Sequence, residues 1–177
     1  MKITMIGAGG WGTAMIKVLA AGNPDVWLYC RNPVTAEELR ETRENKAYLP
    51  GVRIPDQVKI TSDLEEAVWD ADCVILCTPS MAAESMAAAV APYLKKQAVV
   101  VSASKGLASH GGLRLSQVIG EKLASVTDRI AVLSGPNHAS RRRLLRRRWR
   151  SCRTSTWARP SGSIGTATSS VSNMAAR

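Results

Sequence analysis

Residues 3–12 read ITMIGAGGWG, in which a short apolar run is followed by glycines with the spacing Gly-x-Gly-x-x-Gly. The apolar run predicts a strand, and the periodicity after it predicts a helix that starts within the glycines. In such a unit Gly7 permits the tight turn, Gly9 lets the backbone approach a pyrophosphate, and Gly12 lets the helix pack close to the strand. The N–H groups at the helix start attract phosphate. The stretch predicts a dinucleotide-binding loop; the alternative interpretation is a glycine-rich turn that binds nothing.

Beyond this stretch the chain alternates between strand-like and helix-like patterns as far as residue 133. The strand-like runs are Lys2–Ile6, Val26–Cys30, Val58–Thr61, Cys73–Cys77, Val99–Ser102 and Ile130–Leu133, and two of the helix-like runs are Gly10–Leu19 and Leu113–Leu123. We expect Asn32 to cap a helix that begins at Pro33, and Ser62 to open a capping box with Glu65. A further helix is expected from about Met81. The alternation predicts an α/β fold of the Rossmann type, a doubly wound, mostly parallel sheet with helices on both faces.

The positive charge of the chain is confined to its last part. The 177 residues carry a net charge of +10, yet residues 1–139 hold 14 basic and 14 acidic residues. Residues 140–177 hold ten arginines and neither a lysine nor an acidic residue. We therefore expect a neutral NAD(P)-binding domain over 1–139 and an Arg/Ser-rich, disordered, non-native tail over 140–177.

Composition also excludes some classes of protein and of site. No apolar run reaches the ~18 residues of a membrane span, and glycines interrupt the first run too early for a signal peptide. We therefore expect a cytoplasmic protein with reduced thiols at Cys30, Cys73, Cys77 and Cys152. His110 and His138 have no nearby carboxylate in the sequence, so we expect bystanders, with a general base as the alternative. No Cys/His spacing indicates a metal site.

Arg31 follows the second predicted strand, 19 residues after Gly12. An NAD-specific site usually has an acidic residue at this place, which pairs with the ribose hydroxyls. A guanidinium instead suits a 2′-phosphate, because it forms two charge-assisted hydrogen bonds to phosphate oxygens. NADP(H) is therefore favoured and NAD(H) remains possible. The alternative is that Arg31 is a solvated residue near a helix start.

Four segments together resemble the NAD(P)-dependent glycerol-3-phosphate dehydrogenases. They are GAGGWGTA at 7–14, NKAYLPGV at 45–52, SASKGL at 102–107 and LSGPNHA at 133–139. The resemblance covers residues 1–139 and implies an oxidoreductase that reversibly reduces dihydroxyacetone phosphate to sn-glycerol 3-phosphate for phospholipid biosynthesis. It implies a small-molecule substrate and no nucleic-acid partner, and members of this family are often homodimers.

The resemblance also assigns residues to the site. The cofactor contacts that it implies are Gly10, Trp11, Arg31 near the adenosine ribose, Tyr48, Lys105 and Ala139. The substrate contacts that it implies are Lys105, Gly135 and Asn137, the last at a position where Thr or Ser is common. A cation at the carboxyl end of a strand suits a phosphorylated carbonyl compound. The alternative for Lys105 is an ordinary surface lysine.

The resemblance stops after Ala139. An all-helical C-terminal domain with a proton-donating lysine is implied there, and residues 140–177 do not resemble it. We therefore expect a fragment that binds cofactor, holds no catalytic residue and is inactive. Our hypothesis is that the gene carries a truncation or a frameshift near codon 139. An Arg-rich sequence without Lys, Asp or Glu is typical of a GC-rich gene translated out of frame. The DNA should then encode the helical domain in another frame, and its absence would refute the hypothesis.

Three other interpretations remain open. Residues 141–150 could form a basic arm that binds nucleic acid, which a salt titration with and without residues 140–177 would test. Residues 1–139 could be a non-catalytic dinucleotide-binding module. They could also belong to another NADP-dependent reductase of the 2-hydroxyacid or ketopantoate type, against which Trp11, Lys105-Gly106 and the segment GPNHA argue.

Overall fold

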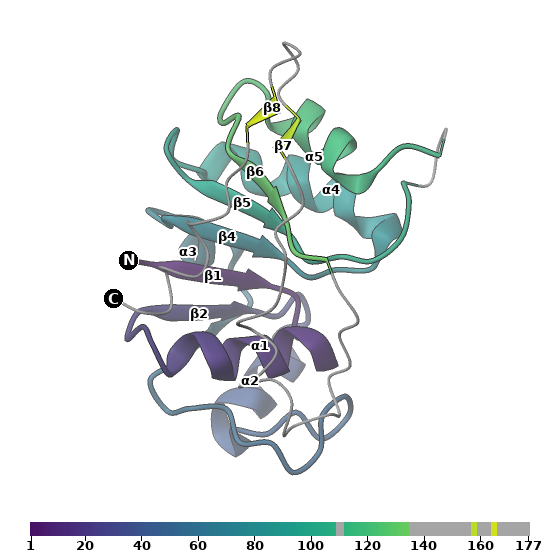
Figure 1. Ribbon diagram of the computed structural model, residues 1–177. Coiled ribbons are helices and arrows are strands. Elements are labelled where there is room, and N and C mark those ends of the chain that lie inside the picture. Colours follow the sequence, from purple (N-terminus) through teal and green to yellow (C-terminus); the bar gives the residue numbers. More distant parts are fainter. Residues whose placement is uncertain (109–111, 135–156, 159–163, 166–177) are drawn as a thin grey trace.

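The computed structural model describes residues 1–108, 112–134, 157–158 and 164–165 (Figure 1). Its first part alternates β1 (Ile3–Ile6), α1 (Gly10–Ala20), β2 (Val26–Tyr29), α2 (Pro33–Thr42), β3 (Lys59–Thr61), α3 (Leu64–Val68) and β4 (Cys73–Leu76). The second part continues with α4 (Ser80–Val90), the 3₁₀ turn η1 (Ala91–Tyr93), β5 (Val99–Ser102), α5 (Leu115–Leu123) and β6 (Ile130–Val132). A separate antiparallel pair joins β7 (Trp157–Ala158) to β8 (Ile164–Gly165).

The six strands β1 to β6 form one sheet in the order β3-β2-β1-β4-β5-β6, and every neighbouring pair is parallel. The chain runs outward from β1 to β3, crosses back to β4 beside β1, and then runs outward again to β6. This is the Rossmann strand order, in which ligands bind outside the carboxyl ends of the strands at the reversal. The predicted fold is confirmed, and its reversal lies between β1 and β4.

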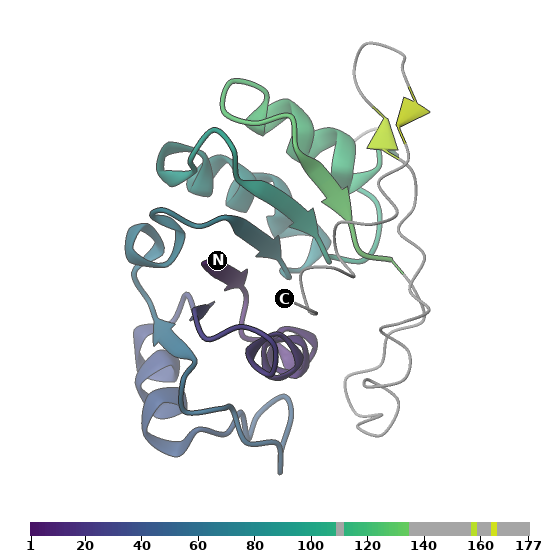
Figure 2. The ribbon, with the colours of Figure 1, turned by 60° about the vertical axis from the view of Figure 1, so that its left-hand side comes forward.

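Alternate residues of each strand face opposite sides of the sheet, and each side has its own core. Ile3 and Met5 of β1 pack with Met15 and Ile16 of α1 on one side. Ile6 belongs to the other core, which contains buried residues of α3, α4 and α5. Figure 2 shows helices on the two sides of the sheet. Because both faces are covered, the strands need the continuous apolar runs seen in the sequence.

The local signals for helix starts are mostly confirmed. The Asn32 side chain accepts hydrogen bonds from the amides of Val34 and Thr35, and α2 begins at Pro33. The expected capping box at Ser62 is wrong by one residue. Asp63 is the N-cap of α3, and its carboxylate accepts from the amide of Glu66. Aspartate and serine are equally good N-cap residues, so spacing alone could not choose between Ser62 and Asp63.

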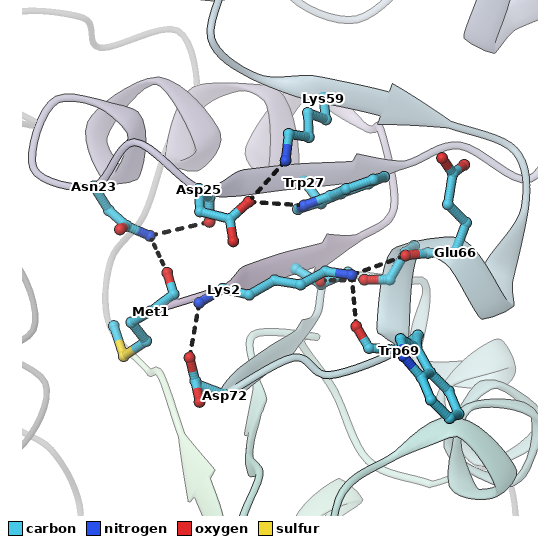
Figure 3. Close-up of polar contacts among 11 residues, drawn as sticks. Met1, Lys2, Asn23, Asp25, Trp27, Lys59, Glu66, Trp69 and Asp72 are labelled. Atoms are coloured by element: carbon cyan, nitrogen blue, oxygen red, sulfur yellow. Dashed lines mark hydrogen bonds and ion pairs between the residues drawn. The ribbon is translucent and has the colours of Figure 1, made fainter.

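A polar cluster around Lys2 lies at the end of the sheet where the parallel strands begin (Figure 3). The Lys2 ammonium donates to the carbonyls of Glu66 and Trp69 at the end of α3, at 2.9 and 2.6 Å. It also lies 4.4 Å from the ring centroid of Trp27. Partial burial lowers the pKa of Lys2. These contacts tie the start of β1 to the helix that precedes β4.

Asp72 begins the turn into β4 and provides a pH-dependent contribution to stability. Its carboxylate lies 2.7 Å from the Lys95 ammonium and accepts from the Lys2 amide. The hydrogen bond from Lys95 holds the pKa of Asp72 below its usual 3.8. A carboxyl whose folded pKa is depressed stabilises the fold above its unfolded pKa, and the effect is lost as pH falls through the folded pKa.

We expect Asp72→Asn to lower the melting temperature at pH 7 and to lose this difference from the parent as pH falls through the depressed folded pKa of Asp72. Asparagine keeps an acceptor for the Lys2 amide but removes the charge. Thermal unfolding between pH 7 and pH 2 measures the effect. Asp56→Asn is the control, because its ion pair with Arg53 is largely exposed and contributes little. A constant difference at every pH would contradict the prediction.

Candidate functional site

The glycine loop between β1 and α1 lies at the reversal of the sheet, and two of its glycines are required by the fold. Gly7 has a φ of +114°, and a Cβ built on it would lie 2.4 Å from the carbonyl oxygen of Cys77 at the end of β4. A Cβ on Gly12 would lie 2.1 Å from the carbonyl oxygen of Gly7. Both contacts are with backbone, which cannot move aside. The tight turn and the close helix–strand packing expected for these positions are therefore present.

Gly9 differs, because nothing in the described protein explains its missing side chain. A Cβ built on Gly9 meets no atom within 4 Å. Gly9 is the N-cap of α1 and has ordinary extended dihedral angles, φ −75° and ψ 176°. It offers no side chain to the amides of the first turn, so no side-chain cap among the described residues satisfies those N–H groups. An open cradle at a helix N-terminus suits an anionic group such as a diphosphate.

The back of the glycine loop is held by two polar side chains that the sequence reasoning missed. The Asn45 amide nitrogen donates to the carbonyl of Ala8 at 2.7 Å and to the Thr13 hydroxyl at 2.8 Å. The Thr13 hydroxyl in turn donates to the carbonyl of Gly9 at 2.9 Å. Asn45 is 2% exposed and Thr13 is fully buried. The carbonyls of the loop are thus bound on the protein side, which leaves the helix-start amides directed away from it.

Two polar atoms beside the loop are buried and lack a partner among the described residues. They are the indole nitrogen Nε1 of Trp11 and the hydroxyl oxygen of Thr78. Trp11 lies inside the motif, and Thr78 follows β4 with its methyl group 3.7 Å from the position of a Cβ on Gly7. An unpaired buried polar group costs about 1–3 kcal/mol, so a ligand that formed a hydrogen bond with either atom would relieve that cost. Thr78 had no sequence signal of its own.

Arg31, predicted near the adenosine ribose, and Tyr48, predicted close to the cofactor, are both exposed. Arg31 follows Cys30 at the carboxyl end of β2, the strand next to β1. Burial raises the pKa of Tyr29, and the positive charge of Arg31 acts in the other direction and lowers it. Tyr48 is 66% exposed, on a segment whose Leu49 and Val52 pack against Trp11. The structure thus brings the segment of Tyr48 to the glycine loop and places Arg31 at the same edge of the sheet.

Lys105 lies beyond β5, on the other side of the reversal, and is exposed. Gly106 after it has a φ of +113°, which explains a glycine at this turn. Burial raises the pKa of the Cys77 thiol to about 11, while the Lys105 ammonium lowers it. This influence places the Lys105 charge near the end of β4, which adjoins the glycine loop.

Cys30, Cys73 and Cys77 are free, and burial raises the pKa of each. They are therefore protonated thiols at neutral pH, as expected. Several other predicted residues lie outside the described part of the chain, namely His110, Gly135, Asn137, His138, Ala139 and Cys152. Within the described residues, no three His, Cys, Asp or Glu side chains cluster as metal ligands would, and none of the helices has the length and apolar character of a membrane span.

Comparison with known proteins places this geometry in one family. Residues 2–141 match the family model described as NAD-dependent glycerol-3-phosphate dehydrogenase N-terminus. A glycerol-3-phosphate dehydrogenase [NAD(P)+] of Moorella thermoacetica is 48% identical over 138 residues. The match covers 78% of this chain and 40% of that protein, so the chain spans well under half the length of such relatives.

Comparison with solved structures points to the same family. The crystal structure of glycerol-3-phosphate dehydrogenase from Coxiella burnetii superposes with a TM-score of 0.71 at 28% identity, over 78% of this chain and 42% of that one. A ketopantoate reductase from Ralstonia eutropha gives a lower TM-score of 0.56 at 27% identity, over 76% of this chain and 41% of its own. The alternative of a ketopantoate-type reductase is therefore the poorer match in structure.

Proposed function

Because this chain belongs to the family of NAD-dependent glycerol-3-phosphate dehydrogenase N-termini, we propose that its glycine loop binds the diphosphate of a nicotinamide dinucleotide. The observation that carries the proposal is the start of α1 at the reversal of the sheet, where Gly9 provides no side-chain cap and a Cβ built on it would meet no described atom within 4 Å. The buried, unpaired atoms of Trp11 and Thr78 supply two further polar groups beside it. The residues present therefore fit such a cofactor.

Within that proposal each side of the site has a role. Gly7, Gly9, Gly10, Trp11 and Gly12 surround the diphosphate, Arg31 lies toward the adenosine ribose, Tyr48 lies close to the cofactor on the segment that packs on Trp11, and Lys105 lies toward the nicotinamide and the substrate. We propose that Gly135, Asn137 and Ala139 complete the site, on the resemblance alone. When bound, the cofactor supplies a hydride for the carbonyl carbon of dihydroxyacetone phosphate. The Lys105 ammonium would hold the negative charge of this substrate and orient it.

Arg31 is proposed to favour NADP(H) over NAD(H). We expect Arg31→Ser to weaken NADPH binding about 10- to 100-fold, because charge-assisted hydrogen bonds to the 2′-phosphate are lost. Binding of NADH should change less than about threefold. Isothermal titration of the whole chain with both cofactors measures the split. Arg129→Ser is the control, since Arg129 donates to the carbonyl of Gln97 at the amino edge of the sheet.

Two outcomes of this titration are decisive. If the parent chain binds neither NADPH nor NADH, the proposed function fails. If Arg31→Ser weakens the binding of NADPH and of NADH equally, Arg31 does not bind the 2′-phosphate. The proposed preference for NADP(H) is then wrong.

Turnover separates an enzyme from a dinucleotide-binding module. The family reaction, reversible reduction of dihydroxyacetone phosphate in phospholipid synthesis in the cytoplasm, is our proposal for the enzyme of which this sequence forms part. For the 177-residue chain alone we propose cofactor binding without turnover, because residues 1–139 supply contacts but no identified proton donor. An assay of NADPH oxidation with dihydroxyacetone phosphate tests this, and a rate of about 1 s⁻¹ or more would overturn it.

The family match supports the proposed division of the chain. It ends at residue 141, next to the change in composition after residue 139. We propose that residues 140–177 do not belong to the family domain, and sequencing the gene through codons 130–180 in all frames tests this.

A further inference from the structure

We propose that Asn45 is a positioning residue that couples the glycine loop to the segment of Tyr48, so that diphosphate binding and the placement of Tyr48 depend on each other. The inference rests on the proposed cofactor site and adds a residue to it. Its basis is a single buried amide that contacts both segments, across 37 residues to Ala8 and three residues to Tyr48.

The orientation of the Asn45 amide is determined by its partners. Its nitrogen faces two acceptors, the carbonyl of Ala8 at 2.7 Å and the Thr13 hydroxyl at 2.8 Å. The Thr13 hydroxyl donates its single hydrogen to the carbonyl of Gly9, so it accepts a hydrogen bond from the Asn45 amide nitrogen. The Asn45 side-chain oxygen accepts from the Tyr48 amide at 3.2 Å. Turning the amide over would set oxygen against oxygen at Ala8, so one arrangement is favoured.

The segment from Glu44 to Arg53 is closed at its base and attached at its tip. Glu44 and Arg53 form an antiparallel bridge, and the amide of Ile54 donates to the carbonyl of Arg43 at 2.7 Å. At the tip, Leu49 and Val52 pack on Ala14 and Trp11 as a small apolar cluster. These apolar contacts attach the segment in addition to Asn45. Removal of the amide is therefore expected to change mainly the alignment of Ala8 and Tyr48.

Alignment of Ala8 matters because a peptide unit is rigid. The carbonyl of Ala8 and the amide of Gly9 belong to one planar group, so a donor that holds the carbonyl on the protein side directs the N–H outward. The Gly9 carbonyl, in the next peptide unit, accepts from both the Thr13 amide and the Thr13 hydroxyl, each at 2.9 Å. Preorganised amides bind an anion without a reordering cost, and loss of the Asn45 donor lets the peptide unit between Ala8 and Gly9 rotate.

The test is cofactor affinity in variants of the whole chain. Asn45→Ala should weaken the binding of NADPH at least tenfold. It should weaken the binding of adenosine 2′-monophosphate, which has no diphosphate, less than threefold. Asn23→Ala is the matched control. Asn23 is another buried asparagine whose amide donates to two carbonyls, those of Met1 and Asp25, at the opposite edge of the sheet (Figure 3). It should lose stability and keep its NADPH affinity.

A double-mutant cycle tests the coupling itself. In the parent, Tyr48→Ala should weaken the binding of NADPH at least fivefold. In the Asn45→Ala background, the same substitution should weaken NADPH binding by less than a further twofold. If the two effects multiply, Asn45 and Tyr48 act independently and the coupling is refuted. If Asn45→Ala leaves NADPH binding unchanged while the parent binds, the inference fails and the proposed function stands. A parent that does not bind refutes the proposed function instead.

Thr13 provides a second route if Asn45→Ala does not fold. Thr13→Val removes the hydroxyl and keeps the shape, and it should weaken NADPH at least tenfold. Thr13→Ser keeps the hydroxyl and should bind within threefold of the parent. Equal affinities for these two variants would refute the role of the network.

Discussion

Replacement of Gly9 by alanine is expected to weaken NADPH and NADH at least tenfold while the fold stays intact. The added methyl group meets no atom of the described residues within 4 Å, and the dihedral angles of Gly9 are ordinary for alanine. It would instead stand in the space where the diphosphate approaches the amides of α1. A tenfold loss corresponds to about 1.4 kcal/mol.

Two measurements check this prediction together. Isothermal titration gives the affinities, and urea unfolding gives the free energy of unfolding, which should change by less than about 1 kcal/mol. Unchanged affinity would mean that the cradle at Gly9 is not the diphosphate site. A large loss of stability would mean that Gly9 is a structural glycine like its neighbours.

Gly12→Ala should have the opposite profile and destabilise the fold by more than about 3 kcal/mol. Its Cβ would lie 2.1 Å from the carbonyl oxygen of Gly7, so α1 or the β1 turn must shift. Because α1 covers one core through Met15 and Ile16, a shift of the helix disturbs packing well beyond the loop. Cofactor affinity should fall as well, since the amides of the helix start move with the helix.

Gly120→Ala is the matched control for this variant. Gly120 lies within α5, and a Cβ there meets nothing within 4 Å. Alanine should therefore stabilise the protein by about 0.5–1 kcal/mol through helix propensity. Urea unfolding of the two variants gives changes of opposite sign. A Gly12→Ala protein within about 1 kcal/mol of the parent would show that the close approach is not a constraint.

Local sequence patterns were sufficient for most of the fold. The apolar runs of β1 and β4 required a sheet covered on both faces, and the Asn32-Pro33 start fixed the beginning of α2. The family match confirms the resemblance carried by GAGGWGTA and three later segments. Differences from the expectation lie at the ends of strands and helices, as at Ser62, where two adjacent residues could each cap. The pair β7–β8 also lies within the tail that was expected to be disordered.

The site was only partly predictable for a different reason. Gly7, Gly9 and Gly12 form a local motif, because the turn that they build lies within six residues. Asn45 and Thr78 belong to the same site but approach it from 37 and about 70 residues away. No periodicity or spacing links such residues, and their type alone suggests an ordinary polar side chain.

From the sequence alone came the order of strands and helices, the phosphate-type loop and the division of charge at residue 139, because each depends on neighbours in the chain. The tertiary structure alone separated Gly9, where a Cβ would meet no atom of the described part of the chain, from Gly7 and Gly12, where a Cβ would collide with backbone. It also brought Asn45 and Thr78 to the loop. These features depend on parallel pairing of β1 with β4 and on the docking of a distant segment, and such long-range contacts are set by packing of the whole core.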